Sequence, residues 1–284
     1  MKTAPVVVKF GGELLDDPAR LDAVTSAIVR IVAATPSLVV VHGGGKEIDA
    51  ALKLAGIEKR QVEGLRITDD RTLDVVVSVV AGAINARLVA ALTTAGVRAV
   101  GLTGADAACG LSDPAPPHRT VDGRTVDLGR VGIPNAASDT RLLSTLTGAG
   151  FVPVIACIGL GGDGRLLNVN ADTLAGHVAA RLGARRLVIA GTTAGVLDEG
   201  GRTVPVIERH AVERMVTGGT ATAGMIAKLR ACEHALDAGV GDVVIVDGRS
   251  EAALEQAALG DRPAAATRIV APVGSSAQRM ERTT

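Results

Sequence analysis

Two glycine-rich turns contain the first residues in this chain that could do chemistry. Residues 9–12 read Lys-Phe-Gly-Gly and residues 42–45 read His-Gly-Gly-Gly, and each turn follows a run of β-branched residues and precedes a stretch of helical length. Glycine lets the backbone approach a phosphate closely, and the N–H groups at the start of a helix favour an anion. Either turn alone is also typical of an ordinary tight connection. Two such turns after consecutive strands favour an anion site at one edge of a sheet.

Two lysines stand apart from the others in this arginine-rich chain. Lys9 interrupts an otherwise apolar, strand-like run, and Lys228 lies within an expected helix at residues 222–238. Lysine is strongly hydrated and is seldom placed in apolar segments. A lysine near a strand end can simply reach solvent, and one in a helix can belong to its polar face, so both interpretations stay open for each residue.

A third polar group stands where a strand turns into a helix, at residues 168–173. Asn168 can donate a hydrogen bond to a substrate carboxylate, and Asp172 in the first helical turn could orient ammonium groups. The same segment is also typical of a capping cluster, in which Asn170 and Asp172 satisfy free backbone donors of the helix. The spacing alone does not separate these two interpretations.

Familiar phosphate and nucleophile motifs do not fit these segments. A P-loop is excluded because the Gly45-Lys46 pair is followed by Glu47 and not by Ser or Thr. Residues 159–164 satisfy G-x-G-x-x-G, but they lead into a strand-like run, so a turn is the better interpretation. The His-Gly-Gly-Gly turn also resembles the oxyanion loop of lipase-like hydrolases, yet the chain contains no G-x-S-x-G elbow.

The composition restricts the class of partner. The chain has 284 residues, of which 47% are hydrophobic, but Trp and Tyr are absent and its aromatic residues are Phe10 and Phe151. The core must therefore consist of Val, Leu, Ile and Ala, and stacking on nucleic-acid bases is not expected. Lys plus Arg and Asp plus Glu both number 30. A neutral chain lacks the broad basic surface that nucleic-acid binding needs, so anion recognition must be local.

The cysteines and the most apolar segment favour a soluble cytoplasmic enzyme. Cys109, Cys157 and Cys232 form no C-x-x-C pair and have no histidine at metal-ligand spacing, so we expect buried reduced thiols and no metal site. The N-terminus lacks the apolar segment of a signal peptide. The most apolar window, residues 75–92, is interrupted by Asn85 and an arginine, which argues against a membrane span.

Short β-branched runs alternate with helix-length, Ala-rich stretches along most of the chain. This alternation predicts a largely parallel sheet covered by helices. We expect strands at residues 6–10, 38–42, 99–102, 152–158, 187–190 and 243–246. We expect helices at residues 18–34, 46–55, 70–94, 139–148, 171–182, 222–238 and 251–258. Residues 114–132 and 159–168 indicate β-hairpins or flaps, and since no flexible linker divides the chain, we expect two lobes that share one sheet.

In combination, five segments resemble the acetylglutamate kinase branch of the amino acid kinase family: residues 9–12, 42–45, 64–68, 168–172 and 224–228. The resemblance implies a three-layer αβα sandwich of the α/β class. It implies an N-terminal lobe, residues 1 to about 184, that binds N-acetyl-L-glutamate and dimerises, and a C-terminal lobe, about 185–284, that binds ATP with Mg²⁺. The implied reaction phosphorylates the side-chain carboxylate to N-acetyl-L-glutamyl 5-phosphate in arginine biosynthesis.

The family pattern also implies a division of catalytic roles. Lys9 and Lys228 would stabilise the transition state, and Asp172 would organise their two ammonium groups. This arrangement suits phosphoryl transfer, which depends mainly on positioning and charge neutralisation. The acceptor carboxylate is ionised at neutral pH and is itself the nucleophile, so the absence of a catalytic histidine is expected.

The resemblance implies separate contacts for the substrate and the nucleotide. N-acetyl-L-glutamate would be held by Gly44, Gly45, Arg66 and Asn168, with the planar fork of Arg66 suited to a carboxylate. The nucleotide would be held by Gly11, Gly12, Thr192, Thr193, Gly195, Leu197, Thr220 and Thr222. No residue is expected to be a metal ligand, since Mg²⁺ would be held mostly by ATP phosphates and water.

Two alternative functions and one question of assembly stay open. Kinases of N-acetyl-aminoadipate, free or carrier-bound, act in lysine biosynthesis on a chain longer by one methylene, a difference worth about 1 to 3 kcal/mol in a pocket. A non-catalytic amino acid sensor is the alternative from another class, although a sensor would have no need of Lys9, Asp172 and Lys228 together. The chain begins at its first strand, without the N-terminal helix of hexameric, arginine-inhibited members. We therefore expect a homodimer without strong feedback.

Overall fold

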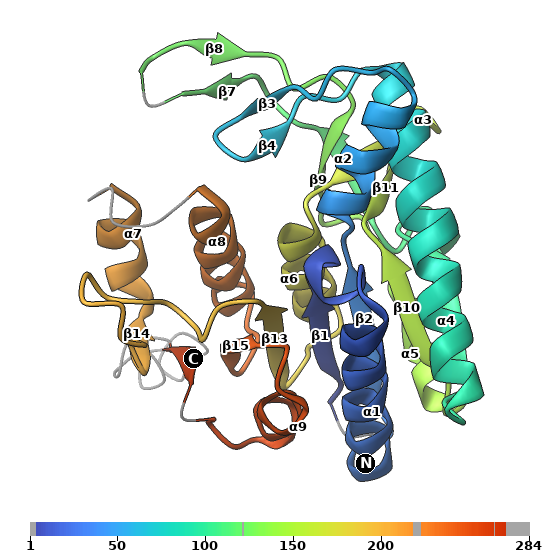
Figure 1. The fold of residues 1–284 in the computed structure, drawn as a ribbon, viewed down its shortest axis with the longest axis vertical. Coiled ribbons are helices and arrows are strands. Elements are labelled where there is room, and N and C mark those ends of the chain that lie inside the picture. The colour runs from blue at the N-terminus through green and yellow to red at the C-terminus, as the bar shows by residue number, and fades with distance from the viewer. Residues whose placement is uncertain (1–3, 121, 218–222, 264, 271–284) are drawn as a thin grey trace, which may run out of the picture.

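A single sheet forms the centre of the fold. The computed structural model describes residues 4–120, 122–217, 223–263 and 265–270, and within these ranges the main sheet has eight strands (Figure 1). All of its neighbouring strands pair in parallel except β15 and β16. The predicted parallel sheet is therefore confirmed. The strands, in order across the sheet, are β14 (Val206–Glu208), β16 (Ala266–Val270), β15 (Val243–Asp247), β13 (Arg186–Gly191), β1 (Val6–Phe10), β2 (Leu38–His42), β10 (Val152–Ala156) and β5 (Ala99–Thr103).

Helices cover both faces of this sheet and give the expected three αβα layers (Figure 1). Val6, Val8 and Phe10 of β1 point into one core, which α1, α4 and α9 complete. Val7 points into the other core, to which α5, α6, α7 and α8 contribute. The helices are α1 (Pro18–Ala34), α2 (Gly45–Leu54), α3 (Asp70–Val77), η2 (Ser78–Ile84), α4 (Asn85–Thr94), α5 (Arg141–Gly148), α6 (Ala171–Arg181), α7 (Arg209–Thr217), α8 (Ala223–Asp237) and α9 (Glu251–Leu259), with short 3₁₀ turns η1 (Gly12–Leu14) and η3 (Asp106–Ala108).

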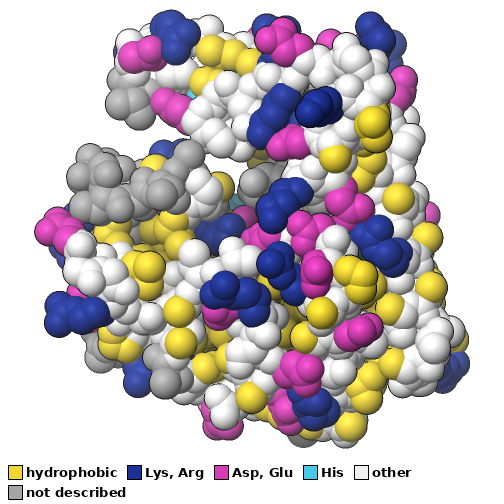
Figure 2. Space-filling model, viewed as in Figure 1, with side chains coloured by type: hydrophobic (Ala, Val, Ile, Leu, Met, Phe, Trp, Pro, Cys, Tyr) yellow, Lys and Arg dark blue, Asp and Glu magenta, His cyan; other side chains and the backbone are white. Residues whose placement is uncertain are grey.

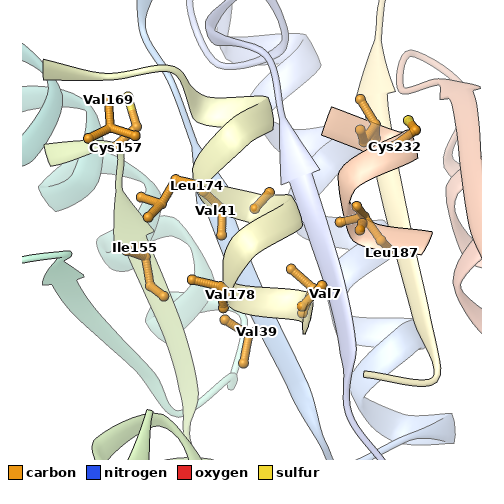
Figure 3. Packing of buried hydrophobic residues seen from close by; sticks show 14 of the residues in the cluster. Val7, Val39, Val41, Ile155, Cys157, Val169, Leu174, Val178, Leu187 and Cys232 are labelled. Carbon is orange, nitrogen blue, oxygen red and sulfur yellow. The ribbon is translucent and has the colours of Figure 1, made fainter. Parts of the chain in front are cut away.

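The core beneath α6 shows how an almost purely aliphatic chain fills its interior. Figure 3 shows Leu174 and Val178 of α6 packed with Val39, Val41 and Ile155 of the sheet. Every residue of β1, β2 and β10 is buried, as is typical of parallel strands covered on both faces. The cysteines Cys109, Cys157 and Cys232 are buried and free, as predicted. Burial of these strands fixes their register and so the positions of the residues at their carboxyl ends.

The long helical segment Asp70–Thr94 is continuous but changes its winding. Between α3 and α4 it forms the π-helix η2, and π-segments inside α-helices are frequently found at functional sites. By length and composition alone this segment could also cross a membrane, and 33% of its most apolar window is buried. Val80, Ile84 and Leu88 pack into the cores of the sandwich, so the segment forms part of a helical layer here.

Hairpins project from one end of the sandwich. The predicted hairpins at residues 114–132 and 159–168 are both confirmed. Figure 1 shows β3–β4 and β7–β8 extending over the end of the molecule where α7 and α8 lie. Four further strands, β6, β9, β11 and β12, close into a small barrel. The bounds are β3 (Gln61–Val62), β4 (Leu65–Arg66), β6 (Leu111–Pro114), β7 (His118–Arg119), β8 (Thr125–Val126), β9 (Val131–Pro134), β11 (Ile158–Gly161) and β12 (Leu166–Val169).

Most predicted elements have the expected bounds, and the differences have simple causes. The strands at 6–10 and 38–42 and the helix at 18–34 are exact, whereas the strand expected at 152–158 divides at Cys157 into β10 and β11. The sequence did not predict β3, β4, β14, β16 or α7. The first two have two residues each, and β14 and β16 mix polar with apolar residues at the border of the sheet, so neither pair presents a buried apolar run.

Candidate active site

Asp172 lies between the two lysines that the sequence singled out. Lys9 Nζ is 2.8 Å from Asp172 Oδ1, and Lys228 Nζ is 3.7 Å from Asp172 Oδ2. Lys9 and Asp172 are buried, with 5% and 7% of their side-chain surface exposed, while the Lys228 side chain keeps 19%. The structure therefore brings the three predicted residues together. It also removes the alternative in which Lys9 merely reaches solvent.

Strand pleating and a helix cap place the first two of these residues. Successive side chains of a strand point to opposite faces, so Lys9 shares with Val7 the face of β1 that α6 covers. Asn170 caps α6, because its Oδ1 accepts from the N–H groups of Asp172 and Thr173. The capping interpretation is thus correct for Asn170. It leaves the Asp172 carboxylate at the start of α6 free to face the lysines.

Close packing of α6 against α8 brings the third residue into place. A Cβ on Gly176 of α6 would lie 3.0 Å from the carbonyl oxygen of Ala231 on α8, so the absence of a side chain lets the two helices approach. Asp172 lies one turn before Gly176, and Lys228 lies one turn before Ala231. The helix contact therefore sets the distance between the carboxylate and the second lysine.

The electrostatics of this cluster keep its charges in place at neutral pH. Burial by itself would raise the pKa of Asp172, but the ammonium groups of Lys9 and Lys228 outweigh it and hold that pKa below the ordinary value. Burial would likewise lower the pKa of Lys9, but attraction to Asp172 outweighs it and the pKa is raised. Lys9, Lys228 and Asp172 together carry one net positive charge, which is suited to stabilising a transferring phosphoryl group.

The two glycine turns lie against each other at the carboxyl ends of β1 and β2. A Cβ on Gly12 would lie 2.6 Å from the Cα of Gly44, so the approach requires glycine. Gly45 begins α2, whose first N–H groups have no partner within the helix. The N–H of Gly11, in contrast, donates to the Ala190 carbonyl at 3.1 Å. That N–H is therefore engaged in the sheet, and a nucleotide contact of Gly11 stays a prediction.

A buried histidine and an asparagine hold the second glycine turn. Asn85 Nδ2 donates to His42 Nε2 at 3.0 Å and to the Val154 carbonyl at 2.9 Å, which leaves the Nδ1–H of His42 to donate to the Gly43 carbonyl at 3.2 Å. Burial lowers the pKa of His42 to about 4, so the ring is neutral at pH 7. Because the peptide group is planar, holding the Gly43 carbonyl also fixes the direction of the Gly44 N–H. Asn85 was not predicted, since no local pattern marks it.

Arg66 and Asn168 belong to one hydrogen-bonded group. Arg66 Nη2 donates to Asp49 Oδ1 at 2.5 Å, and Lys59 Nζ is 2.6 Å from the other oxygen of Asp49. Asn168 Nδ2 donates to Thr68 Oγ1 at 3.1 Å, and that hydroxyl donates to the Arg66 carbonyl. Arg66 Nη1 is buried and has no hydrogen-bond partner in the part of the chain that the structure describes. Asp49 was missed because its partners, Lys59 and Arg66, lie outside its own helix.

A cavity of about 740 Å³ adjoins this group. The hairpins β3–β4 and β7–β8 bound it on one side and α6 and α8 on the other, and Figure 2 shows the molecule hollowed between these parts. Its lining includes Thr173 and Ala227, which are neighbours of Asp172 and Lys228, so it opens beside the charged centre. The rest of the lining is mostly apolar and includes Leu65, Pro116, Pro117, Val131, Ile133 and Ile226.

The predicted nucleotide segment follows β13. Thr192 and Thr193 come directly after this strand, whose neighbour in the sheet is β1. Gly195 has a φ of 84°, and a Cβ there would lie 2.5 Å from Thr267 Oγ1, so glycine is needed for packing against β16. Leu197 is 44% exposed. The other two predicted nucleotide contacts, Thr220 and Thr222, lie outside the described residues.

The fold and this site together define a class of protein. An αβα sandwich with glycine turns and a helix N-terminus at the ends of adjacent parallel strands can hold phosphates, and paired lysines beside them are suited to phosphoryl transfer. Residues 4–247 match the amino acid kinase family. The chain belongs to this family.

One curated relative and two solved structures show which proteins this chain is similar to. The acetylglutamate kinase of Sphingopyxis alaskensis is 42% identical over 248 residues, which make up 86% of this chain and 82% of the relative. The N-acetylglutamate synthase of Neisseria gonorrhoeae, solved with coenzyme A and N-acetyl-glutamate, has a TM-score of 0.79 at 24% identity over 95% of this chain and 60% of its own. Carbamate kinase from Giardia lamblia bound to AMP-PNP has a TM-score of 0.67 at 18% identity, over 95% of this chain and 99% of its own. The two structural likenesses support the fold alone.

Proposed function

We propose that this chain transfers the γ-phosphoryl group of ATP to the side-chain carboxylate of N-acetyl-L-glutamate, as a step of arginine biosynthesis. The products are N-acetyl-L-glutamyl 5-phosphate and ADP. The observation that carries the proposal is the buried Asp172 between Lys9 and Lys228 at the ends of parallel strands. The choice of acceptor is supported by the name of the relative from Sphingopyxis alaskensis, at 42% identity.

The chemistry needs little from the protein beyond charge and position. A carboxylate oxygen attacks the γ-phosphorus, an oxygen–phosphorus bond forms, and the bond from phosphorus to the leaving oxygen of ADP breaks. No proton is transferred, so no general base is required. This agrees with His42, which is buried, neutral and has both ring nitrogens in hydrogen bonds. Lys9 and Lys228 would neutralise the oxygens of the phosphoryl group in transit.

The acceptor would lie between β4, β12 and α2. The unpartnered Nη1 of Arg66 is a buried donor that a substrate carboxylate would satisfy, and such a donor is costly to leave unpaired. Asn168 adds an amide beside it. Gly44 and Gly45, at the start of α2, offer N–H groups and the positive end of the helix dipole to the reacting carboxylate. The adjoining apolar cavity has room for the acetyl group.

The nucleotide would lie over the ends of β1 and β13. Gly11 and Gly12 would be the contacts from the first glycine turn, with Gly12 on the phosphates and the loop after β13 beside it. In the part of the chain that the structure describes, no group of three or more His, Cys, Asp or Glu could hold a metal by itself. Mg²⁺ would therefore be held mainly by ATP phosphates, where it supplies further charge neutralisation. The remaining proposed nucleotide contacts are Thr192, Thr193, Gly195, Leu197, Thr220 and Thr222.

The proposal includes two lobes, a homodimer and a cytoplasmic location. The boundary proposed near residue 184 lies between α6 and β13. The segment Asp70–Thr94 supports the homodimer, because its most apolar window is only 33% buried within one chain and a second copy would cover more of it. Light scattering of the purified chain measures the mass directly. A monomeric mass at micromolar concentration would refute the dimer.

An assay that traps acyl phosphates tests the reaction. The chain is incubated with ATP, Mg²⁺ and hydroxylamine and with N-acetyl-L-glutamate, N-acetyl-aminoadipate, aspartate or carbamate in turn. We expect the fastest hydroxamate formation from N-acetyl-L-glutamate. Faster product from N-acetyl-aminoadipate would move the assignment to lysine biosynthesis, and no product from any acceptor would favour a sensor.

Two lysine variants test the mechanism in the same assay. Lys9→Ala and Lys228→Ala should each lower turnover by about 10² to 10³, the scale of losing one preorganised charge donor. Lys53→Ala is the matched control, since this lysine is exposed in the last turn of α2. Near wild-type turnover in either of the first two variants would contradict the assigned roles.

A further inference from the structure

Glu13 places a carboxylate inside the phosphate end of the site. It lies in the short turn η1, and its Oε1 and Oε2 occupy the position that a Cβ on Gly11 would take. Its Oε1 is also 3.7 Å from the Cβ position of Gly191, the last residue of β13. The carboxylate therefore occupies the space that a side chain at Gly11 would need, and it lies beside the glycine that ends β13.

The direction of this space follows from the strand pleat. Side chains alternate between the two faces of a strand, so position 11, directly after β1, lies on the same face as Lys9. Gly191 is the last residue of β13 and pairs with the last residue of β15. The Cε of Lys228 lies 3.6 Å from the same Cβ position of Gly191. The Glu13 carboxylate and the end of the Lys228 side chain thus both lie beside the end of β13.

The partners of Glu13 do not explain this position. Arg20 binds the backbone carbonyl of Glu13 at 2.8 Å and leaves the carboxylate alone. Among the described residues the carboxylate has no ion pair within 4.0 Å, whereas both oxygens of Asp172 face a lysine. Glu13 attracts Lys9 electrostatically, more weakly than Asp172 does and without forming an ion pair. A carboxylate with no cation in contact, in the place where a triphosphate is expected, would repel that triphosphate.

A divalent cation resolves this conflict. Mg²⁺ prefers oxygen ligands and is typically bound through one or two carboxylates together with substrate phosphates. We propose that the Glu13 carboxylate is a protein ligand of the Mg²⁺ that enters with the nucleotide. The inference rests on the proposed ATP site and departs from the expectation that no residue of the chain binds the metal. In this role Glu13 favours the metal-loaded nucleotide, because its carboxylate attracts Mg²⁺ and repels free ATP.

Nucleotide binding measured with and without metal tests this proposal. Calorimetric titration with AMP-PNP is carried out on the full chain in excess Mg²⁺ and again in EDTA, and Mn²⁺ binding to the AMP-PNP complex is followed by electron paramagnetic resonance. Glu13→Gln keeps the shape and removes the charge. Glu13→Asp keeps an oxygen ligand on a shorter side chain. Glu251→Gln is the matched control, since this residue pairs with Arg30 on the surface of α9.

The expected result is an opposite effect on the two forms of the nucleotide. In Glu13→Gln the metal-loaded analogue and Mn²⁺ should bind about 10-fold more weakly, the usual scale for losing a group that supports a metal. The metal-free analogue should bind at least as tightly as it does to the wild type. Glu13→Asp should retain part of the metal preference, and Glu251→Gln should retain all of it.

Other outcomes overturn the proposal in distinguishable ways. Tighter binding of both forms by Glu13→Gln would make Glu13 a simple repulsive neighbour, and unchanged binding of both would remove it from the site. Either result would leave the proposed kinase intact. A wild-type chain that binds AMP-PNP under neither condition would overturn both this proposal and the proposed function. Far-UV circular dichroism shows whether each variant is folded.

Discussion

Replacing Asp172 by Asn isolates the charge that holds the two lysines. Asn has nearly the same shape, so the helix cap and the packing of α6 are preserved while the carboxylate charge is removed. Lys9 then keeps a buried ammonium group whose counter-ion was 2.8 Å away. Removing one partner of a buried ion pair costs about 3 to 5 kcal/mol, because the remaining charge is left uncompensated. We expect the free energy of unfolding at pH 7 to fall by that amount.

The pH dependence of this loss follows from the sign of each pKa shift. In the wild type the pKa of Lys9 is raised and that of Asp172 is lowered. The contribution of Lys9 is therefore present below pH about 10.4 and is lost as pH rises through its raised pKa. The contribution of Asp172 to stability is present above pH about 3.9 and is lost as pH falls through its lowered pKa. Between these limits the pair contributes a constant stability.

In Asp172→Asn the shift of the Lys9 pKa changes direction. Without Asp172, burial dominates and lowers the pKa of Lys9 below its unfolded value. The unfolded state then binds more protons than the folded state between that lowered pKa and about 10.4, so stability increases with pH in this window. The penalty of Asp172→Asn should therefore shrink between pH 7 and pH 10, by about 1.4 kcal/mol for each unit of the shift.

Urea unfolding followed by far-UV circular dichroism measures this, since the chain has no Trp or Tyr for fluorescence. Asp163→Asn is the control, because its carboxylate is 61% exposed and lies 3.9 Å from Arg165. An exposed pair of this kind is worth less than about 1 kcal/mol. A penalty for Asp172→Asn that equals the control, or that is the same at pH 7 and pH 10, would refute this account of the pair. Turnover should also fall by about 10² or more, as expected when catalytic groups lose their positions.

Three further predictions concern the glycine turns, the acceptor and acid stability. Gly12→Ala should lower turnover by about 10², because its Cβ would lie 2.6 Å from Gly44 Cα and force the turns apart, while Gly82→Ala, which meets open space, should not. Arg66→Lys should raise the KM for the acceptor by about 10- to 100-fold and leave the KM for ATP unchanged, since a single ammonium cannot replace a planar fork. In His42→Gln, the loss of unfolding free energy between pH about 6.5 and 4 should be smaller than in the wild type by about 3 kcal/mol, because a group with a folded pKa of about 4 is removed. An unchanged acid profile would mean that His42 is not held neutral.

Much of the fold could be read from local patterns. The buried runs of β1 and β2 and the glycine turns that follow them have the expected bounds, because period and turn chemistry act within a few residues. That Lys9 shares one face of β1 with Val7 follows from strand alternation alone. The pattern did not predict β14 and β16, whose pairing is set at the border of the sheet by strands far away in the chain.

The sequence by itself determined which residues could form the site: Lys9, Lys228 and Asp172, with glycine turns at the ends of parallel strands. Only the tertiary structure decided which of their contacts exist. The approach of α6 and α8 at Gly176 sets the geometry around Asp172, and the end of β13 at Gly191 lies beside both Glu13 and Lys228. These contacts join residues far apart in the chain, and they depend on packing distance and register, which no local pattern encodes.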